Sequence, residues 1–227
     1  MLFAAGTLGF FAENVREHYV ERHRERDYLA KIASDLRTDI EAMDKAVPIE
    51  QARLSAGTRA MELYDSRTYP AQTGEFYYHS RVFMIRSAFV HTNSGFLQVI
   101  NSGGMRLISN PKLLEGIQSY ELAVERYRGT QDLNDAQMAD LRRFAGDVFD
   151  TRVFNSMLAP DRKTLDLLTY YRRPEGNPPL MTTDEKIINR FMHSVFTCVN
   201  LEAIRQNRLR DLRESAVALI AMLEKQK

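Results

Sequence analysis

The sequence predicts an all-α protein, a long-helix antiparallel bundle of about five or six helices with a short N-terminal membrane-anchoring helix. Three observations predict this class. Apolar residues recur at helical spacing along most of the 227 residues. The eleven glycines and seven prolines are few, and they cluster, which leaves long uninterrupted segments. An apolar stretch opens the chain and is followed at once by dense charge.

The overall composition is that of an ordinary globular protein, with 44% hydrophobic and 27% charged residues. The 31 lysines and arginines balance 30 aspartates and glutamates, so no net charge draws the chain toward nucleic acid, and we expect no nucleic-acid partner. Cys198 is the only cysteine. It cannot form an internal disulfide or, by itself, a thiolate metal site.

Residues 2–12 carry no charge and are mostly apolar. We expect residues 1–12 to be a hydrophobic anchor that continues directly into a helical bundle domain over residues 13–227. As a helix, this run covers roughly 16 Å, about half of the ~30 Å hydrocarbon thickness of a bilayer. The residues predicted to contact lipid or a partner are the large apolar ones: Leu2, Phe3, Leu8, Phe10 and Phe11.

Three interpretations of this apolar run are open. It is the C-terminal half of a membrane helix that starts upstream, a short anchor inserted beside partner helices, or a buried N-terminal turn of a core. A secretory signal fits poorly, because no basic region precedes the run and no small-residue cleavage site follows it. Basic residues just beyond the run favour the cytoplasmic side under the positive-inside rule: Arg16, Arg22, Arg24, Arg26 and Lys31.

An apolar stripe carries the first helix well past the charged segment. Its members recur at spacings of 3, 4, 4, 3 and 4: Leu29, Ile32, Leu36, Ile40, Met43 and Val47. Pro48 is expected to end or kink this helix, with a second helix over 49–64. The Pro, Gly and Thr content predicts a loop over 65–80. Its aromatic residues are candidates for packing on the helices or for a contact surface: Tyr69, Phe76, Tyr77 and Tyr78.

A helix is expected over 81–101, with a break near 91–94, and a joint then turns the chain into the next helix. Four residues form this predicted joint: Gly103, Gly104, Asn110 and Pro111. Glycine accepts the positive φ that closes a helix, asparagine caps the next one, and proline suits a first helical position. A phosphate-binding loop is excluded, because no strand precedes the glycines and no G-K-[ST] follows them.

The second half of the chain reads as helices around one long loop. Apolar residues share a face over 113–124, and an amphipathic helix is expected from 132 to about 157. The segment 159–183 holds four prolines and is the longest irregular stretch. Thr182 or Thr183 is expected to cap a last helix of about forty residues, which we expect to pair antiparallel with the first.

No motif in the sequence indicates catalysis, so we expect no catalytic residues, no metal ligands and no cofactor. None of the five histidines has another histidine four residues away, and H-E-x-x-H is absent. Glu121 and Glu125 lack the partners of a di-iron site, which favours a solvated helix face. Cys198 lies on an apolar stripe and is expected to be a small buried hydrophobe. The charged residues 13–26 form i,i+3 pairs, which favours a solvated helix over a lipid-headgroup or nucleic-acid patch.

Two segments resemble a family of bacterial proteins known only as a domain of unknown function, in which one N-terminal membrane helix leads into a helical domain. One is "LGFFAENVREHYVERHRERDYLAKIASDLRTDI", residues 8–40, and the other is "FLQVINSGGMRLISNPKLLEGIQSYE", residues 96–121. Together they cover about a quarter of the chain. The resemblance implies a membrane-anchored helical protein and carries no catalytic residue. Family members usually show a full spanning segment, whereas this chain shows about half of one.

We therefore expect a non-catalytic, membrane-anchored accessory or scaffold subunit that docks onto and stabilises a larger bacterial membrane protein complex, for example a respiratory or photosynthetic one. Its partners would be membrane lipid and other membrane-protein subunits, and homo-oligomerisation is compatible with the sequence. The expected location is the bacterial inner membrane, through a single N-terminal anchor. The alternative is a membrane-anchored sensor or small-ligand-binding domain, with its cleft near residues 69–78 and the 159–183 loop. An enzyme that acts through scattered residues is the third interpretation.

Overall fold

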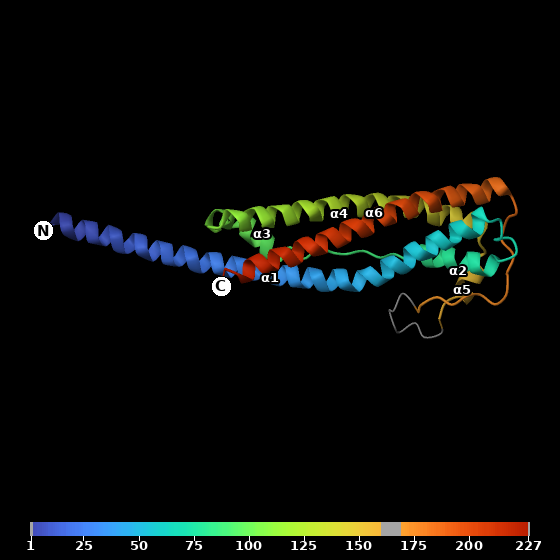
Figure 1. Cartoon of the computed structure of the whole chain (residues 1–227), viewed down its shortest axis with the longest axis horizontal. Coiled ribbons are helices and arrows are strands. Elements are labelled where there is room, and N and C mark those ends of the chain that lie inside the picture. The colour runs from blue at the N-terminus through green and yellow to red at the C-terminus, as the bar shows by residue number, and fades with distance from the viewer. Residues whose placement is uncertain (1, 160–168, 227) are drawn as a thin grey trace. The chain divides into compact units, whose positions relative to one another are not determined.

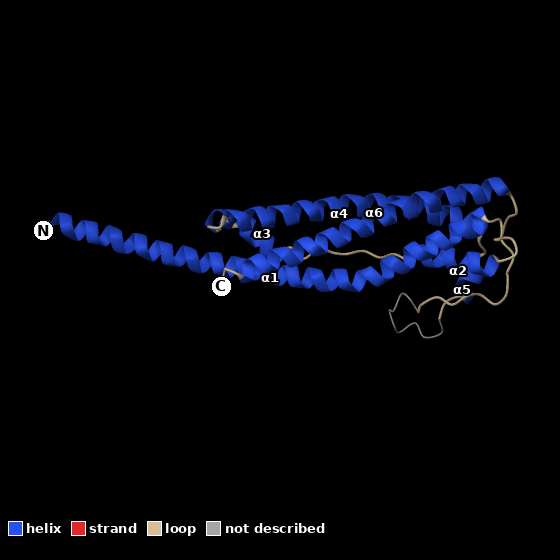
Figure 2. Ribbon diagram, viewed as in Figure 1, coloured by secondary structure: helices blue, strands red, loops and turns tan. Residues whose placement is uncertain are grey.

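The computed structural model describes residues 2–159 and 169–226, with side chains from Phe11 onward. Every regular element in that part of the chain is helical, apart from an isolated bridge between Leu158 and Tyr171 (Figure 2). The all-helical class predicted from the sequence is therefore confirmed. The elements in chain order are α1 (Leu2–Asp65), α2 (Thr73–Phe83), α3 (Ser94–Asn101), the 3₁₀ helix η1 (Gly104–Leu107), α4 (Pro111–Val148), α5 (Thr151–Ser156) and α6 (Glu185–Glu224).

α1 is one continuous helix of 64 residues, and Pro48 lies inside it. The prediction of a separate helix over 49–64 is therefore wrong. A proline inside a helix removes one backbone donor and clashes with the preceding turn, at a cost of roughly 3 kcal/mol. The Pro48 ring is exposed, whereas Ala46 and Glu50, two residues away on the opposite side of the helix, are buried. Burial of that opposite side outweighs the missing hydrogen bond.

α2 occupies much of the segment predicted to be a loop, and the chain is irregular over 85–93, where a helix was predicted. Both predictions are wrong because contacts between distant segments override the local sequence signals. A Cβ on Gly74, in the first turn of α2, would lie 2.2 Å from the carbonyl oxygen of Gly176. This glycine therefore serves the close approach of a distant loop and does not mark a turn. Helix propensity is a weak signal that packing overrides, and six residues of α2 are buried.

The predicted joint lies between α3 and α4. Gly103 follows the last residues of α3 with a φ of 68°, in the left-handed region that favours glycine. A Cβ on Gly104 would lie 2.5 Å from the Tyr28 ring, so this position is also confined to glycine. The Asn110 side chain accepts a hydrogen bond of 3.0 Å from the backbone N–H two residues further on, and α4 begins at Pro111.

α4 is a single helix of 38 residues and joins the two helical segments predicted over 113–124 and 132–157. The last part of the second predicted segment is a separate short helix, α5. α6 has 40 residues. Its cap lies one residue later than predicted, because the carboxylate of Asp184 accepts from the backbone N–H of Lys186 at 2.8 Å.

The chain divides into two compact units, whereas the sequence predicted one bundle domain over 13–227. Each unit combines segments that are distant in the sequence. Unit 1 comprises Met1–Ala42, Val90–Val124 and Leu212–Lys227, and unit 2 comprises Met43–Phe89 and Glu125–Asp211. Three of the boundaries fall inside α1, α4 and α6, where the sequence carries no linker signal, and the fourth falls between Phe89 and Val90 in the irregular segment before α3.

The core of unit 2 is rich in aromatic side chains. Phe149 lies 5.2 Å from both Phe76 and Phe191, measured between ring centroids, and all three rings are buried. α2 and α5 lie side by side (Figure 1), with the Tyr77 and Phe154 rings 5.6 Å apart. Cys198 is fully buried in the same core, and burial raises the pKa of its thiol to about 12. The prediction of a small buried hydrophobe is confirmed.

Within unit 2, α1 and α6 run antiparallel, as predicted. Near one end the Tyr64 hydroxyl donates to Asn189 at 3.0 Å, and near the other the Gln206 amide donates to the carbonyl oxygen of Glu50 at 2.6 Å. Between these contacts, a Cβ on Gly57 would lie 2.7 Å from the Val199 side chain. The glycine in α1 thus allows the two helices to approach closely.

A network of buried charged side chains, which we call the ion network, connects α1 and α6 inside unit 2. Arg205 lies 2.9 Å from a carboxylate oxygen of Glu50 and 2.7 Å from one of Glu202, and its side chain is 0% exposed. Arg53 lies 3.2 Å from the other oxygen of Glu202. On α4, the Tyr127 hydroxyl accepts from Arg205 at 3.2 Å. Burial raises the pKa of Glu50 to about 7, although Arg205 opposes this rise.

The ion network gives the first prediction. Replacing Arg205→Met should lower the free energy of unfolding by about 3–5 kcal/mol, because two buried carboxylates lose a shared cation. The measurement is urea-induced unfolding followed by circular dichroism. Arg210→Met, at an exposed position one turn further along α6, is the matched control and should change the free energy by less than about 0.5 kcal/mol. Equal effects of the two substitutions would contradict the central role of Arg205.

Candidate functional site

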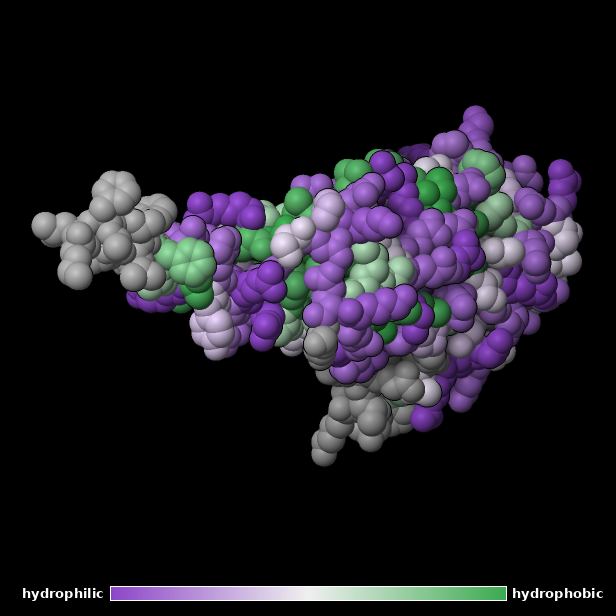
Figure 3. Space-filling model, turned by 60° about the vertical axis from the view of Figure 1, so that its left-hand side comes forward, coloured by the Kyte–Doolittle hydropathy of each residue, from purple (hydrophilic) through white to green (hydrophobic). Residues whose placement is uncertain are grey.

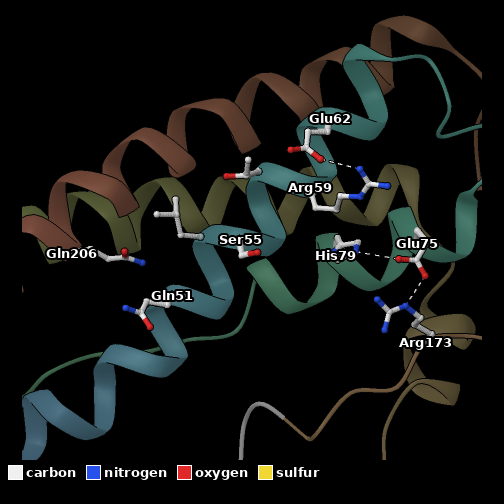
Figure 4. A pocket seen from close by; sticks show the side chains of 10 residues that line it. Gln51, Ser55, Arg59, Glu62, Glu75, His79, Arg173 and Gln206 are labelled. Atoms are coloured by element: carbon white, nitrogen blue, oxygen red, sulfur yellow. Dashed lines mark hydrogen bonds and ion pairs between the residues drawn. The ribbon is translucent and has the colours of Figure 1, made fainter.

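Unit 2 carries a surface groove with polar walls, which we call the polar groove. It encloses about 570 Å³. One wall is a face of α1 whose residues recur at helical spacing, and the rest of the lining comes from α2, from Arg173 in the 159–183 loop and from Gln206 of α6 (Figure 4). The lining residues are Gln51, Leu54, Ser55, Thr58, Arg59, Glu62, Glu75, His79, Arg173 and Gln206.

Glu75 is the electrostatic centre of the polar groove. Figure 4 shows its carboxylate between His79 and Arg173, at 3.1 Å from the His79 Nε2 and 2.5 Å from the Arg173 Nε. Burial raises the pKa of Glu75, but the hydrogen bonds and charges of the two neighbours outweigh burial and lower it. Burial also lowers the pKa of His79, against the opposing effect of Glu75.

A lowered pKa makes His79 predominantly neutral at pH 7. A neutral ring that donates from Nε2 to Glu75 leaves Nδ1 as an acceptor, and this atom is buried without a hydrogen-bond partner among the described residues. Arg173 also stacks on the Tyr78 ring, with 4.4 Å between the guanidinium carbon and the ring centroid. The groove therefore offers amide, hydroxyl and guanidinium groups with nearly balanced charge, which suits a small polar molecule.

Unit 1 contains a second cluster of titratable side chains, which we call the histidine clasp. His91 Nδ1 lies 2.6 Å from a carboxylate oxygen of Asp39 on α1, and its Nε2 lies 3.3 Å from Glu121 on α4. The Tyr120 hydroxyl donates to Asp39 at 2.7 Å, and the backbone N–H of Thr92 donates to it at 2.7 Å. The clasp thereby attaches the irregular segment before α3 to α1 and α4.

Two opposing effects set the charge of His91. Burial lowers its pKa, but hydrogen bonds and charges from Asp39 and Glu121 outweigh burial and raise the pKa to about 9. Glu121 is therefore a partner of a buried histidine, and the expectation that it lies on a solvated face is wrong. Among the described residues, no group of three or more His, Cys, Asp or Glu side chains has the arrangement of a metal site.

The predicted anchor residues Leu2, Phe3, Leu8 and Phe10 lie on α1, and their side chains are outside the described residues. Phe11 is described and is 68% exposed. No helix in the described part of the chain is long and apolar enough to cross a membrane. The surface visible in Figure 3 is mostly hydrophilic, with hydrophobic side chains in small patches.

The aromatic residues predicted as a contact surface divide into two groups. Phe76 and Tyr77 are 0% exposed and belong to the core of unit 2, so they are not available to a partner. The Tyr77 hydroxyl donates to the carbonyl oxygen of Pro179 at 3.0 Å, which ties α2 to the end of the long loop. Tyr69 and Tyr78 are partly buried against the same core. The contact-surface interpretation therefore fails for the first two residues, because α2 turns them inward.

The clusters that the structure reveals were not identified from the sequence, and the reasons differ. Glu75 and His79 are four residues apart on one helix, a spacing that places both on one face and could have marked the polar groove. His91 and Asp39 are separated by 52 residues. Nothing local in the sequence pairs them.

Comparisons with known proteins give no relative from which a function can be transferred. No protein-family model matches the chain, and neither a curated protein nor a solved structure matches it.

The histidine clasp gives the second prediction. The pKa of His91 is raised from 6.5 to about 9, so its contribution to stability is complete below pH 6.5 and is lost as the pH rises through 9. We expect the free energy of unfolding to fall by roughly 3 kcal/mol across this range. His91→Gln should abolish most of this fall, whereas His193→Gln, at an exposed position on α6, should retain it. Urea unfolding at pH 6, 7, 8 and 9.5 is the measurement, and a fall that persists in His91→Gln would refute the assignment.

Proposed function

We propose that this chain is a non-catalytic, membrane-anchored accessory subunit, which docks through the N-terminal part of α1 onto lipid and the membrane-embedded side of a larger bacterial complex. The observation that supports this proposal is a stripe of exposed apolar and aromatic side chains that begins at the end of the apolar run and extends past it. Phe11, Val15 and Tyr19 are 68%, 55% and 77% exposed, and their spacing of four places them on one face of α1.

The free energy falls when lipid or protein covers exposed apolar side chains on one face of a helix. The described side chains of residues 11–20 are all exposed, so no other part of the described chain buries this stripe. The stripe continues the apolar run of residues 2–12 on the same helix. We propose on the same grounds that the protein belongs with the membrane-anchored helical family that its sequence resembles, and that it resides at the bacterial inner membrane.

Flotation with lipid vesicles tests the anchor and gives the third prediction. The wild-type chain should float with vesicles of bacterial lipid composition, whereas Leu8→Ser/Phe11→Ser should lose at least about a hundredfold in partitioning. This magnitude follows because two large apolar side chains contribute roughly 1.5–3 kcal/mol each when buried. Leu133→Ser/Phe196→Ser removes the same residue types from exposed sites on α4 and α6 and should float as the wild type does.

Equal loss in both double variants, or no flotation of the wild type, would contradict the anchor. Purification from bacterial membranes in mild detergent separates the docking role from simple lipid binding. A chain that floats with vesicles but elutes as a monomer without membrane-protein subunits would retain the anchor and contradict the accessory role.

The polar groove favours a second candidate function, that of a small-ligand-binding domain. The walls of the groove include Glu75 and His79 from α2 and Arg173 from the 159–183 loop, which supports this candidate. Neutral His79 and the paired charges suit a small polar or zwitterionic molecule that exchanges hydrogen bonds with amide and hydroxyl side chains.

Thermal unfolding with a panel of amino acids and sugars tests this candidate and gives the fourth prediction. A ligand at a hundred times its Kd should stabilise the folded chain by about 2.7 kcal/mol. Ser55→Tyr fills the groove and should abolish the shift. Ser34→Tyr, at an exposed serine on α1 outside the groove, should preserve it. A shift that is the same in both variants would place the ligand elsewhere.

A further inference from the structure

Unit 2 carries a second groove, which we call the arginine groove. It encloses about 650 Å³ between the end of α2, the C-terminal half of α4, α5 and Tyr170 and Tyr171 of the 159–183 loop. Three of its lining residues are arginines, and among the described residues that line it none is an aspartate or a glutamate. The lining residues are Arg81, Met84, Ile85, Arg86, Arg142, Ala145, Gly146, Phe149, Thr151, Phe154, Tyr170 and Tyr171.

The arginines of this groove have few carboxylate partners. Arg86 lies 3.5 Å from Asp135, which does not line the groove. Neither Arg81 nor Arg142 forms an ion pair with a carboxylate in the described part of the chain. Arg142 donates to the carbonyl oxygen of Met84 at 3.0 Å, which uses one of its five donors. The polar groove differs, since each of its arginines is paired with a glutamate.

Aromatic rings hold Arg81 in place. Its guanidinium carbon lies 4.4 Å from the centroid of the Tyr171 ring and 5.8 Å from that of Phe154, and it donates a hydrogen bond to the Tyr171 hydroxyl. Tyr170 packs edge-on against Tyr171, with 5.1 Å between centroids. A guanidinium fixed by stacking loses little rotamer freedom when it binds an anion, and planar rings offer a flat apolar wall beside it.

Gly146 leaves the helical wall of the groove open. A Cβ at this position would meet no atom within 4 Å, although Ala145 and Val148 on the same helix are buried in the core. Glycine inside a helix costs roughly 0.5–1 kcal/mol relative to alanine. No close approach of backbone requires this glycine, so its effect is to leave space along the wall of the arginine groove.

We propose that the arginine groove binds a small anion with a planar apolar ring, whose phosphate or carboxylate group pairs with Arg81 and Arg142. The ring then lies against the tyrosines and Phe154. This site is independent of the N-terminal anchor and of the polar groove. It would make the protein responsive to an anionic aromatic metabolite whether or not it docks onto a membrane complex.

The fifth prediction uses two fluorescent probes that share one ring system, of which only one carries an anionic group. 8-Anilinonaphthalene-1-sulfonate carries the ring system and an anion, and N-phenyl-1-naphthylamine carries the same rings without the anion. We expect the full-length chain to bind the sulfonate probe at one site and at least about tenfold more tightly than the neutral probe. Equal affinity for the two probes would overturn the role of the arginines.

Substitutions locate the site. Arg81→Gln and Arg142→Gln should each weaken sulfonate binding about tenfold, whereas Arg143→Gln, an exposed neighbour paired with Asp140, should not. Gly146→Leu should abolish binding by filling the groove without a clash. Gly129→Leu is its matched control, because this glycine of α4 also has open space around it and lies outside the groove. Both variants replace a glycine inside a helix with leucine, which has a higher helix propensity. Their thermal stability should therefore equal or exceed that of the wild type.

Competition distinguishes the two anionic groups. Phenyl phosphate that displaces the probe better than benzoate assigns a phosphate ligand, and the reverse assigns a carboxylate. Displacement by neither compound, or unchanged probe binding in Gly146→Leu, would overturn the proposal. Because the leucine variants are read against each other, this conclusion stands even if an arginine variant fails to fold.

Discussion

The pairing of Arg205 with two buried carboxylates is the constraint on which unit 2 depends. A carboxylate in the interior loses its hydration and is stable only if a cation or several donors replace the water. Glu50 and Glu202 come from α1 and α6, and both lie within 3 Å of the same guanidinium. The charges therefore fix which residues of these antiparallel helices face each other, and a sliding of one helix along the other would leave a buried charge unpaired.

The same physical rule operates in unit 1, where the histidine clasp holds an irregular segment to two helices. Backbone groups outside regular structure need partners, and carboxylates on α1 supply them. Asp39 accepts from the N–H of Thr92, and Asp35, one turn earlier, accepts at 2.6 Å from the N–H of Gly95, which lies in the first turn of α3 and has no partner within that helix. Long-range polar contacts thus order the segments that lack helical hydrogen bonds. Local propensity therefore does not predict the conformation of these segments.

The polar groove, the arginine groove and the exposed stripe of α1 differ in how far their charges are balanced. Glutamates neutralise the arginines of the polar groove, which suits an uncharged or zwitterionic molecule. In the described part of the chain, no acidic residue lines the arginine groove, which suits an anion. The exposed stripe through Phe11 on α1 has charge around it but no charge within it, which suits lipid or a hydrophobic partner surface. Each surface thus has a chemistry that selects a different class of partner.

The helical class, the joint at Gly103 and Pro111, the burial of Cys198 and the antiparallel pairing of α1 with α6 were predictable from the sequence. These properties follow from periodicity, special backbone conformations and hydropathy, all of which can be read along the chain. The continuation of α1 through Pro48 and the burial of Phe76 inside a helix of the core depend on tertiary packing. It also brought His91 to Asp39 and assembled both grooves. At Pro48 and Phe76, packing free energy overrides helix propensity. The His91–Asp39 contact and the two grooves depend on residues that meet only when the chain folds.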